Sequence, residues 1–347
     1  MRILVTGGAG FIGSEFVRQT LARSAHEEVT VLDQLTYAGN LENLRSVASD
    51  SRFRFVHGDI ADPRAVETAL EGCQAVVNFA AETHVDRSIL EPDAFVKTDV
   101  LGTWTLAQAA RAAGVQRFLQ VSTDEVYGAL LEGASIESDR LDPSSPYSAS
   151  KAGGELLVLA AYKTYNLPAL IIRGANAYGP YQYPEKLIPL HITNAIDDQQ
   201  LPVYGDGQQR RQWTHVEDFA SGVDSVLRAG EPGQIYNIGS PEPEAEMPVN
   251  LALSQRVLEL LGKPTSLIDY VVDRPAHDRR YRVDPGKLLG LGWQPKWRFW
   301  NGLEATVNWY AEQPDWWRSI KSDARHQTFH AQNYGDRTLQ VFTRGTS

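Results

Sequence analysis

The sequence predicts an α/β protein in which a doubly wound parallel sheet carries a smaller, interleaved C-terminal lobe. Short apolar runs recur through residues 2–123, and the segments between them have the length and periodicity of helices. This alternation continues to about residue 175, after which the chain loses the rhythm. Alternating strands and helices are typical of a parallel sheet with helices on both faces.

The expected strands are continuous apolar runs, as in strands that are buried on both faces. The first five are RILVTG (2–7), EVTVLD (28–33), FRFVHGD (53–59), AVVNFAA (75–81) and RFLQVST (117–123). A helix that ends near Asn166, Leu167 and Pro168 precedes a sixth strand, PALIIR (168–173). The run QIYNIGS (234–240) indicates one more strand of the same sheet.

The part of the chain after Ala175 is rich in prolines and aromatic residues, which favours a loop-rich lobe. We therefore divide the chain into residues 1–175, joined by a later strand near 234–239, residues 176–320 as mainly the smaller lobe, and a tail of residues 321–347. The sequence is polar from about Ser319, so we expect this end to be loosely packed or to form an oligomer contact.

Composition limits the classes of function. The 347 residues include 42% hydrophobic and 22% charged residues, enough for a substantial core, and the net charge of -10 disfavours nonspecific nucleic-acid binding. The single cysteine, Cys73, excludes an internal disulfide and is expected to be a packed side chain rather than a nucleophile. With no apolar run of about 18 residues, no signal peptide and no metal-binding cluster, we expect a cytoplasmic protein without a membrane or metal partner.

A glycine turn follows the first expected strand. Gly7, Gly10 and Gly13 form a G-x-x-G-x-x-G pattern, which lets the backbone approach a pyrophosphate at the start of a helix. Asp33 ends the second strand, 20 residues after Gly13, where a carboxylate binds ribose hydroxyls and repels a 2′-phosphate. This Rossmann-type pattern predicts NAD rather than NADP. Asp59, after the third strand, is either an adenine contact or a helix cap.

Two further clusters carry reactive groups. Tyr147 and Lys151 are four residues apart and face the same side of a helix, where an ammonium favours the phenolate that a tyrosine base needs. Alone, such a pair more often marks a solvated helix face. The stretch STDEVYG (122–128) places Asp124 and Glu125 at the end of the fifth strand, where they either cap the next helix or do chemistry.

Together these motifs resemble the extended short-chain dehydrogenase/reductase superfamily and, within it, the dTDP-glucose 4,6-dehydratases. The resemblance extends from residue 2 to about 320 through VTGGAGFIGS, LDQLTYAGN, NFAAETHVDRSI, STDEVYG, PYSASK, YGPYQYPEKLIPL, LPVYGDG, DRPAHDRRY and LGW. It implies an NAD-dependent hydro-lyase that oxidises C4 of an NDP-glucose, eliminates water across C5 and C6 and returns the hydride to C6. It also implies a homodimer that takes part in deoxysugar synthesis.

The resemblance assigns roles to the reactive groups. Tyr147 would deprotonate the C4 hydroxyl, Thr123 would hydrogen-bond the sugar near O4, and Lys151 would orient the nicotinamide ribose and tune Tyr147. Asp124 would be the neutral acid at the C6 hydroxyl and Glu125 the ionised base at C5. Two adjacent carboxylates suit these roles because their repulsion raises one pKa.

The resemblance also implies the binding residues. The cofactor would contact Gly7, Gly10, Phe11, Ile12, Gly13, Asp33, Gln34, Leu35, Thr36, Asp59, Ile60, Phe79, Ala80, Ala81, Thr98, Tyr147 and Lys151. The sugar nucleotide would contact Thr83, Thr123, Asn176, Lys186, Leu187, Pro202, Val203, Tyr204, Arg211, Asp273, Arg274 and His277. Arg211 is expected to bind the diphosphate, with a surface salt bridge as the alternative, and His277 could equally be a structural hydrogen bonder.

Several positions depart from the family pattern, among them residues 211–219, where RDWxYVxDH becomes RQWTHVEDF. Ala177 replaces an asparagine that contacts the cofactor, and Asp99 replaces the asparagine of a TNVxGT motif. Met247 occupies the position of another asparagine, with Asn250 three residues further on. If Asp99 is buried where the family has an amide, the carboxyl needs a proton or a basic partner.

Other functions are compatible with some of these motifs. The same dehydration could use UDP-glucose or another NDP-glucose. A sugar-nucleotide 4-epimerase or decarboxylase would share Gly7, Asp33, Tyr147 and Lys151 but has no use for Asp124 and Glu125. A noncatalytic NAD-binding regulator is the alternative from another class, and the intact Tyr147 and Lys151 pair argues against it.

Overall fold

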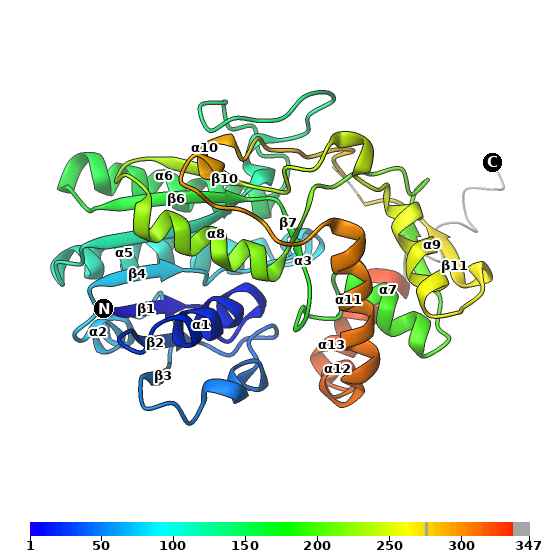
Figure 1. Ribbon diagram of the computed structural model, residues 1–347, viewed down its shortest axis with the longest axis horizontal. Helices are drawn as coiled ribbons and strands as arrows, with labels where there is room; N and C mark the ends of the chain where they lie inside the picture. The colour runs from blue at the N-terminus through cyan, green and yellow to red at the C-terminus, as the bar shows by residue number, and fades with distance from the viewer. Residues whose placement is uncertain (275–276, 336–347) are drawn as a thin grey trace.

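In the part of the chain that the computed structural model describes, residues 1–274 and 277–335, the central element is a seven-stranded parallel sheet (Figure 1). Its order is β10-β6-β5-β4-β1-β2-β3. The strands are β1 (Arg2–Thr6), β2 (Glu28–Asp33), β3 (Phe53–His57), β4 (Ala75–Asn78), β5 (Arg117–Thr123), β6 (Ala169–Gly174) and β10 (Ile235–Ile238). The expected fold class and its sheet strands, including the late one, are confirmed.

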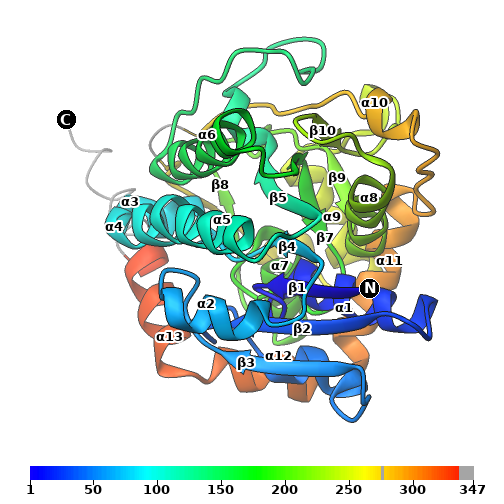
Figure 2. The ribbon, with the colours of Figure 1, turned by 90° about the vertical axis from the view of Figure 1, so that its left-hand side faces the viewer.

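Helices cover both faces of this sheet and produce three layers (Figure 2). One face carries α2 (Pro63–Leu70), α5 (Thr103–Ala112) and α6 (Pro146–Tyr165), and the other carries α1 (Phe11–Arg23), α8 (Val216–Ala229) and α10 (Gly286–Leu289). Neighbouring residues such as Leu4 and Val5 enter separate cores, because successive strand side chains point to opposite faces. Cys73 is buried in the core beneath α2.

Helix α6 begins and ends at residues that the sequence favours for these positions. Pro146 occupies its first turn, and the Ser145 and Ser148 side chains cap each other's backbone N–H groups. The helix ends at Asn166, whose φ of 59° is left-handed. The end expected near residue 166 is confirmed, and the helix holds Tyr147 and Lys151 at its N-terminal end, near the end of β5.

The smaller lobe, at the right of Figure 1, has its own apolar core. Its helices are α7 (Leu187–Ile196), α9 (Asn250–Leu260), α11 (Phe299–Glu312), α12 (Pro314–Lys321) and α13 (Ala324–His330). Two short parallel pairs join them: β7 (Asn176–Tyr178) with β9 (Trp213–His215), and β8 (Leu201–Tyr204) with β11 (Ile268–Val271). No sequence pattern predicted these two pairs.

The two lobes interleave along the chain. After β9 the chain returns to the large sheet with α8 and β10, and after β11 it returns again with α10. Phe219, Ile238 and Trp293 of these returning segments pack into the core of the large sheet. Within the expected tail, His326 and Phe329 of α13 are buried, and a π-helical turn (residues 331–335) follows. Residues 336–347 of that tail lie outside the described residues.

Four short helical segments connect the sheet to the site. They are α3 (Val85–Leu90) and α4 (Pro92–Phe95), which lead into a π-helical segment (Val96–Gly102), and a 3-10 turn (Asp124–Tyr127) that follows β5. No helix in the described part of the chain has the length and apolar character needed to cross a bilayer.

Candidate active site

The glycine turn between β1 and α1 brings backbone unusually close to backbone. Gly7 has a φ of 66°, and a Cβ there would lie 2.6 Å from the backbone nitrogen of Ala80. A Cβ on Gly13 would lie 2.3 Å from the carbonyl oxygen of Gly7. Helix α1 starts at Phe11 with Gly10 as its N-cap, so its free N–H groups face the space above the turn. This cradle suits a pyrophosphate.

Asp33 closes the turn from the end of β2. Its Oδ2 accepts a hydrogen bond from the Ala9 N–H at 2.9 Å, and its Oδ1 accepts one from the Leu35 N–H at 2.8 Å. Burial raises the pKa of Asp33, and these two backbone donors oppose that rise. The carboxylate is therefore held at the turn with lone pairs left for ribose hydroxyls.

Asp59 lies at the next strand end. Its Oδ1 accepts from the Ala61 N–H, and its Oδ2 lies 2.8 Å from the Lys97 ammonium. Helix α2 is capped instead by Asp62, whose side chain accepts from the Arg64 N–H. The helix-cap alternative for Asp59 is therefore wrong, and its side chain lines the cavity described next.

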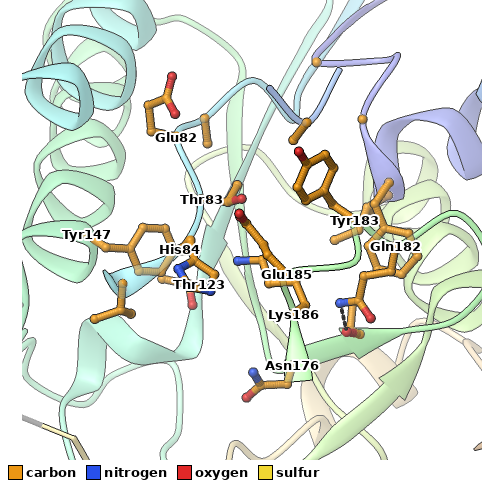
Figure 3. A pocket seen from close by; sticks show the side chains of 18 of the residues that line it. Glu82, Thr83, His84, Thr123, Tyr147, Asn176, Gln182, Tyr183, Glu185 and Lys186 are labelled. Atoms are coloured by element: carbon orange, nitrogen blue, oxygen red, sulfur yellow. Dashed lines mark hydrogen bonds between the residues drawn. The ribbon is translucent and has the colours of Figure 1, made fainter. Parts of the chain in front are cut away.

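A single cavity of about 410 Å³ runs from the glycine turn to the smaller lobe (Figure 3). All the residues expected to bind cofactor or substrate line it, with the exceptions of Leu35 and Asp273. Leu35 has a φ of 54° and contributes its backbone N–H to Asp33. Asp273 accepts a hydrogen bond from Gln209 and lies 2.6 Å from Nδ1 of His277, so it supports a lining residue.

Asp124 and Glu125 lie at the end of β5, inside this cavity. Thr123 caps the 3-10 turn, with its Oγ1 accepting the Glu125 N–H at 3.3 Å. Asp124 is only 3% exposed and is not the cap, so that alternative is wrong. Its Oδ1 accepts from the Thr123 hydroxyl, while its buried Oδ2 has no partner among the described residues.

The two carboxyl groups experience different charges. Burial, together with the charge of Glu125, raises the pKa of Asp124 to about 8. Burial also raises the pKa of Glu125, but Arg274, Arg211 and Lys186 oppose this rise. At neutral pH this arrangement favours a proton on Asp124 and a negative charge on Glu125.

Tyr147 and Lys151 project from the first turns of α6 toward the same end of the cavity, and Figure 3 shows the Tyr147 ring close to Thr123. Burial and the nearby acids Glu125 and Asp99 raise the pKa of Tyr147, and a hydrogen bond with Thr123 lowers it. Lys151 donates from Nζ to the Val121 carbonyl at 2.9 Å. Its ammonium is thus anchored to the end of β5, beside the tyrosine.

Cationic side chains surround the far half of the cavity. Arg211 is 6% exposed, donates to the carbonyls of Arg210 and Asp278, and stacks over the Tyr281 ring with a 4.7 Å separation. It makes no ion pair within the described residues, so the surface salt-bridge alternative is wrong. Lys186 lines the same half of the cavity, and Arg274 lies 3.5 Å from Asp86. Arg211 is buried and the other two cations are partly buried, and three positive charges facing one space suit a diphosphate.

Several residues that line the cavity were not predicted from the sequence. Glu82, His84 and Glu185 are labelled in Figure 3, and all lie within motifs that were used only for the resemblance. His84 has a φ of 116°, a strained value for a residue with a side chain, and strain of this kind is concentrated at functional sites. Glu185 forms an ion pair with Arg87 at 2.7 Å. Tyr334 also lines the cavity, and no sequence signal marked it.

The departures from the family pattern fall in different places. Ala177 lines the cavity with a methyl group, and its carbonyl accepts from the Gln182 amide, drawn in Figure 3. Met247 is buried away from this cavity, whereas Asn250 lines it. Asp99 is 2% exposed, and burial raises its pKa to about 6, with Lys151 opposing. The expected burial cost and basic neighbour are both present.

The cavity is equipped for polar ligands. Oδ1 of Asn176 and Oδ1 of Asn250 are buried, line it and lack a hydrogen-bond partner among the described residues, as does Oδ2 of Asp124. Buried polar atoms are normally paired, so these atoms indicate bound polar groups. The glycine cradle offers free N–H groups to a pyrophosphate, and Asp33 offers oxygens to ribose hydroxyls, so both fit NAD. In residues 1–274 and 277–335 no cluster of three His, Cys, Asp or Glu side chains is placed to hold a metal ion.

Comparison with known proteins places this geometry in a family. Residues 4–306 match the family model described as GDP-mannose 4,6 dehydratase. A dTDP-glucose 4,6-dehydratase of Streptomyces niveus is 49% identical over 327 residues, which cover 93% of this chain and 96% of the relative.

Solved structures agree with this placement. The dTDP-glucose 4,6-dehydratase DesIV of Streptomyces venezuelae, solved with NAD bound, is 50% identical with a TM-score of 0.89 over 92% of this chain and all of that one. A UDP-glucose 4-epimerase of Thermus thermophilus, also with NAD, is 31% identical with a TM-score of 0.83 over 90% of this chain and all of that one. The fold is thus shared with epimerases, whereas the sequence identity to the dehydratases is higher. The chain therefore belongs to the dTDP-glucose 4,6-dehydratase family.

Proposed function

We propose that this protein is an NAD-dependent dehydratase that converts an NDP-glucose, foremost dTDP-glucose, to the NDP-4-keto-6-deoxyglucose. The observation that carries the proposal is the buried Asp124 and Glu125 pair beside Tyr147, at one end of a cavity that begins at a dinucleotide cradle. Bound NAD would accept the hydride from C4 of the sugar and return it to C6, so the overall change is loss of one water. The hydro-lyase activity and NAD agree with the family.

The cofactor would occupy the half of the cavity that the larger lobe forms. Its pyrophosphate would lie on the N–H groups after Gly10, and its adenosine ribose would bind Asp33. We place the division between this cofactor lobe, residues 1–175 with the strand near 234–239, and the sugar-nucleotide lobe, residues 176–320, at the β6–β7 junction. The close approach of Gly7 to Ala80 supports the position of the cofactor in the larger lobe, since a side chain at residue 7 would fill the cradle.

Tyr147 would remove the proton of the C4 hydroxyl, with Thr123 hydrogen-bonded to the same part of the sugar. Burial raises the pKa of Tyr147, and the nearby carboxyls do the same, so the tyrosine needs a positive neighbour to act as a base. Lys151 is that neighbour on the next turn of α6, and it would also hold the nicotinamide ribose.

Asp124 and Glu125 would divide the elimination between them. The raised pKa of Asp124, about 8, supports its role as the neutral acid that protonates the departing C6 hydroxyl. Arg211 and Arg274 near Glu125 support an ionised base that removes the C5 proton and later returns one. A 4-epimerase needs neither group, and this difference favours dehydration over the epimerase alternative.

The sugar nucleotide would lie across the smaller lobe. Arg211, Arg274 and Lys186 would bind the diphosphate, because they bring three positive charges to one part of the cavity. His277, supported by Asp273 at 2.6 Å, would bind nearby. Pro202, Val203 and Tyr204 would contact the base, and Thr83, Asn176 and Leu187 the rest of the nucleotide sugar. UDP-glucose or another NDP-glucose is the alternative substrate.

We further propose a cytoplasmic homodimer. The apolar side chains of Ile89, Leu90, Val96, Leu101 and Leu156 are between 41% and 56% exposed on α3, the π-helical segment and α6, which adjoin one another. Such a group of exposed apolar residues supports a protein contact. The single buried thiol of Cys73 suits a reducing compartment. Light scattering of the purified protein, with and without Leu101→Glu, tests the dimer.

The decisive experiment uses purified protein and a panel of NDP-glucoses, without added cofactor. Mass spectrometry should detect loss of one water, fastest with dTDP-glucose. Conversion of UDP-glucose to UDP-galactose would instead establish the epimerase. Retained dehydration in the double variant Asp124→Asn, Glu125→Gln would exclude the proposed roles of the pair.

A further inference from the structure

Asp99 is a buried carboxyl with no role in the mechanism above, at a position where the resembled family has an amide. It lies on the π-helical segment Val96–Gly102, and its Oδ1 accepts the Glu82 N–H at 3.1 Å. Its Oδ2 accepts from the Ser150 hydroxyl at 2.7 Å. A Cβ on Gly154 would lie 2.2 Å from the Asp99 carbonyl oxygen, so this segment and α6 touch at their backbones. The carboxyl is therefore held in one place.

The position of Asp99 makes it the acid available to balance Lys151. Ser150, its hydrogen-bond partner, immediately precedes Lys151 on α6. The main negative charges acting on Lys151 are those of Asp99 and Glu155. Glu155 is already paired with Arg173 at 2.6 Å, in a fully buried ion pair. The charge of Asp99 thus remains for Lys151, although the two groups form no direct ion pair.

We propose that Asp99 is a positioning residue for the reaction, whose carboxylate keeps Lys151 charged while its own negative charge opposes the phenolate form of Tyr147. Removal of the C4 hydroxyl proton then occurs at a higher pH than it would with an amide at position 99. This inference rests on the proposed function for the role of Tyr147 as the base. The pKa of Tyr147 is raised by burial, Glu125 and then Asp99, in agreement with the geometry.

Other charged groups face the same region. They are Glu82 after β4, Asp124 and Glu125 at the end of β5, Tyr147, Lys151 and Glu155 on α6, and Arg173 on β6. Glu82 lies above Tyr147 in Figure 3, and burial and the charge of Asp99 raise its pKa to about 7. Glu82 is thus the matched control, since it carries a carboxyl in the same cluster but is not a main charge on Lys151.

The substitution Asp99→Asn removes the charge and keeps the hydrogen bonds. The amide oxygen can still accept the Glu82 N–H, and the amide nitrogen can donate to the Ser150 oxygen. The Ser150 hydroxyl then donates to the Tyr147 carbonyl, which already lies 2.8 Å away. Because the family carries an amide here, the variant is expected to fold.

Two measurements test the proposal on wild type, Asp99→Asn and Glu82→Gln. The first is pH-dependent competitive labelling of the Lys151 amine, followed by mass spectrometry, which requires no turnover. The second is the pH profile of NAD reduction in a single turnover with dTDP-glucose. Asp99→Asn should lower the midpoint of both by about one pH unit, a roughly tenfold change in proton affinity. Glu82→Gln should shift them much less.

Unchanged midpoints in Asp99→Asn, an alkaline shift, or an equal shift in Glu82→Gln would each overturn the proposal. The last result would mean that any negative charge in the cluster has the same effect. If no sugar nucleotide is turned over, the proposed function fails, but the Lys151 labelling still decides whether Asp99 holds the lysine charge.

Discussion

The substitution Asp124→Asn should make the protein more stable while it removes an acid from the active site. The pKa of Asp124 is raised from 3.8 to about 8, by burial first and by Glu125 second. The folded protein therefore binds this proton more tightly than the unfolded chain. That contribution is complete below about pH 4 and is lost progressively as the pH rises to about 8. Asparagine does not titrate, so the variant does not lose unfolding free energy at this position as the pH rises.

The magnitude follows from linkage. Each pH unit between about 4 and 8 lowers the unfolding free energy of the wild type by about 1.4 kcal/mol relative to the variant. At pH 7 the accumulated difference is about 4 kcal/mol, from which about 1–3 kcal/mol is subtracted for burying an amide that lacks partners. For 347 residues the entropy of unfolding is about 0.7 kcal/mol per kelvin, so the slope equals about 2 °C in Tm per pH unit.

The assay is the thermal unfolding of cofactor-free wild type and Asp124→Asn at several pH values between 4 and 9. Asp142→Asn is the matched control, because Asp142 has an exposed side chain in a nearby loop. The gain in stability that grows with pH should therefore be specific to the buried position, Asp124. A pH-independent difference for Asp124→Asn would refute the argument that burial holds a proton on this carboxyl.

Three further substitutions test the other parts of the site. Glu125→Gln should slow water loss by roughly 10²–10⁴-fold and abolish deuterium uptake at C5 in heavy water, while reduced cofactor still accumulates; unimpaired C5 exchange would contradict its role as the base. Gly13→Ala should weaken NAD binding by tenfold or more in calorimetry, because the added Cβ would lie 2.3 Å from the Gly7 oxygen. Arg211→Lys should raise KM for the sugar nucleotide by roughly 10–100-fold with a smaller change in kcat, since the planar fork is lost; an unchanged KM would remove Arg211 from the diphosphate site.

The larger sheet and its cofactor turn could be predicted from local sequence patterns. Strands buried on both faces are continuous apolar runs, so β1 to β6 and β10 could be recognised from short segments without knowledge of their neighbours. The glycine turn, Asp33 and the end of α6 at Asn166 likewise depend on local backbone requirements. The positions of Asp124, Glu125, Tyr147 and Lys151 in one cavity could be inferred because each lies at the end of a strand or the start of a helix.

Features that depend on contacts between residues far apart in the sequence could not be predicted in this way. The pairs β7 with β9 and β8 with β11 are three or four residues long and join segments far apart in sequence, so no local period marks them. Whether Asp59 and Asp124 are helix caps depended on where Asp62 and Thr123 place their side chains. The strain at His84, the ion pair of Glu185 with Arg87 and the place of Tyr334 in the cavity emerge only when the lobes pack together. The pKa of Asp124 is likewise a property of the folded cavity, because burial and neighbouring charges, rather than residue type, decide which carboxyl keeps its proton.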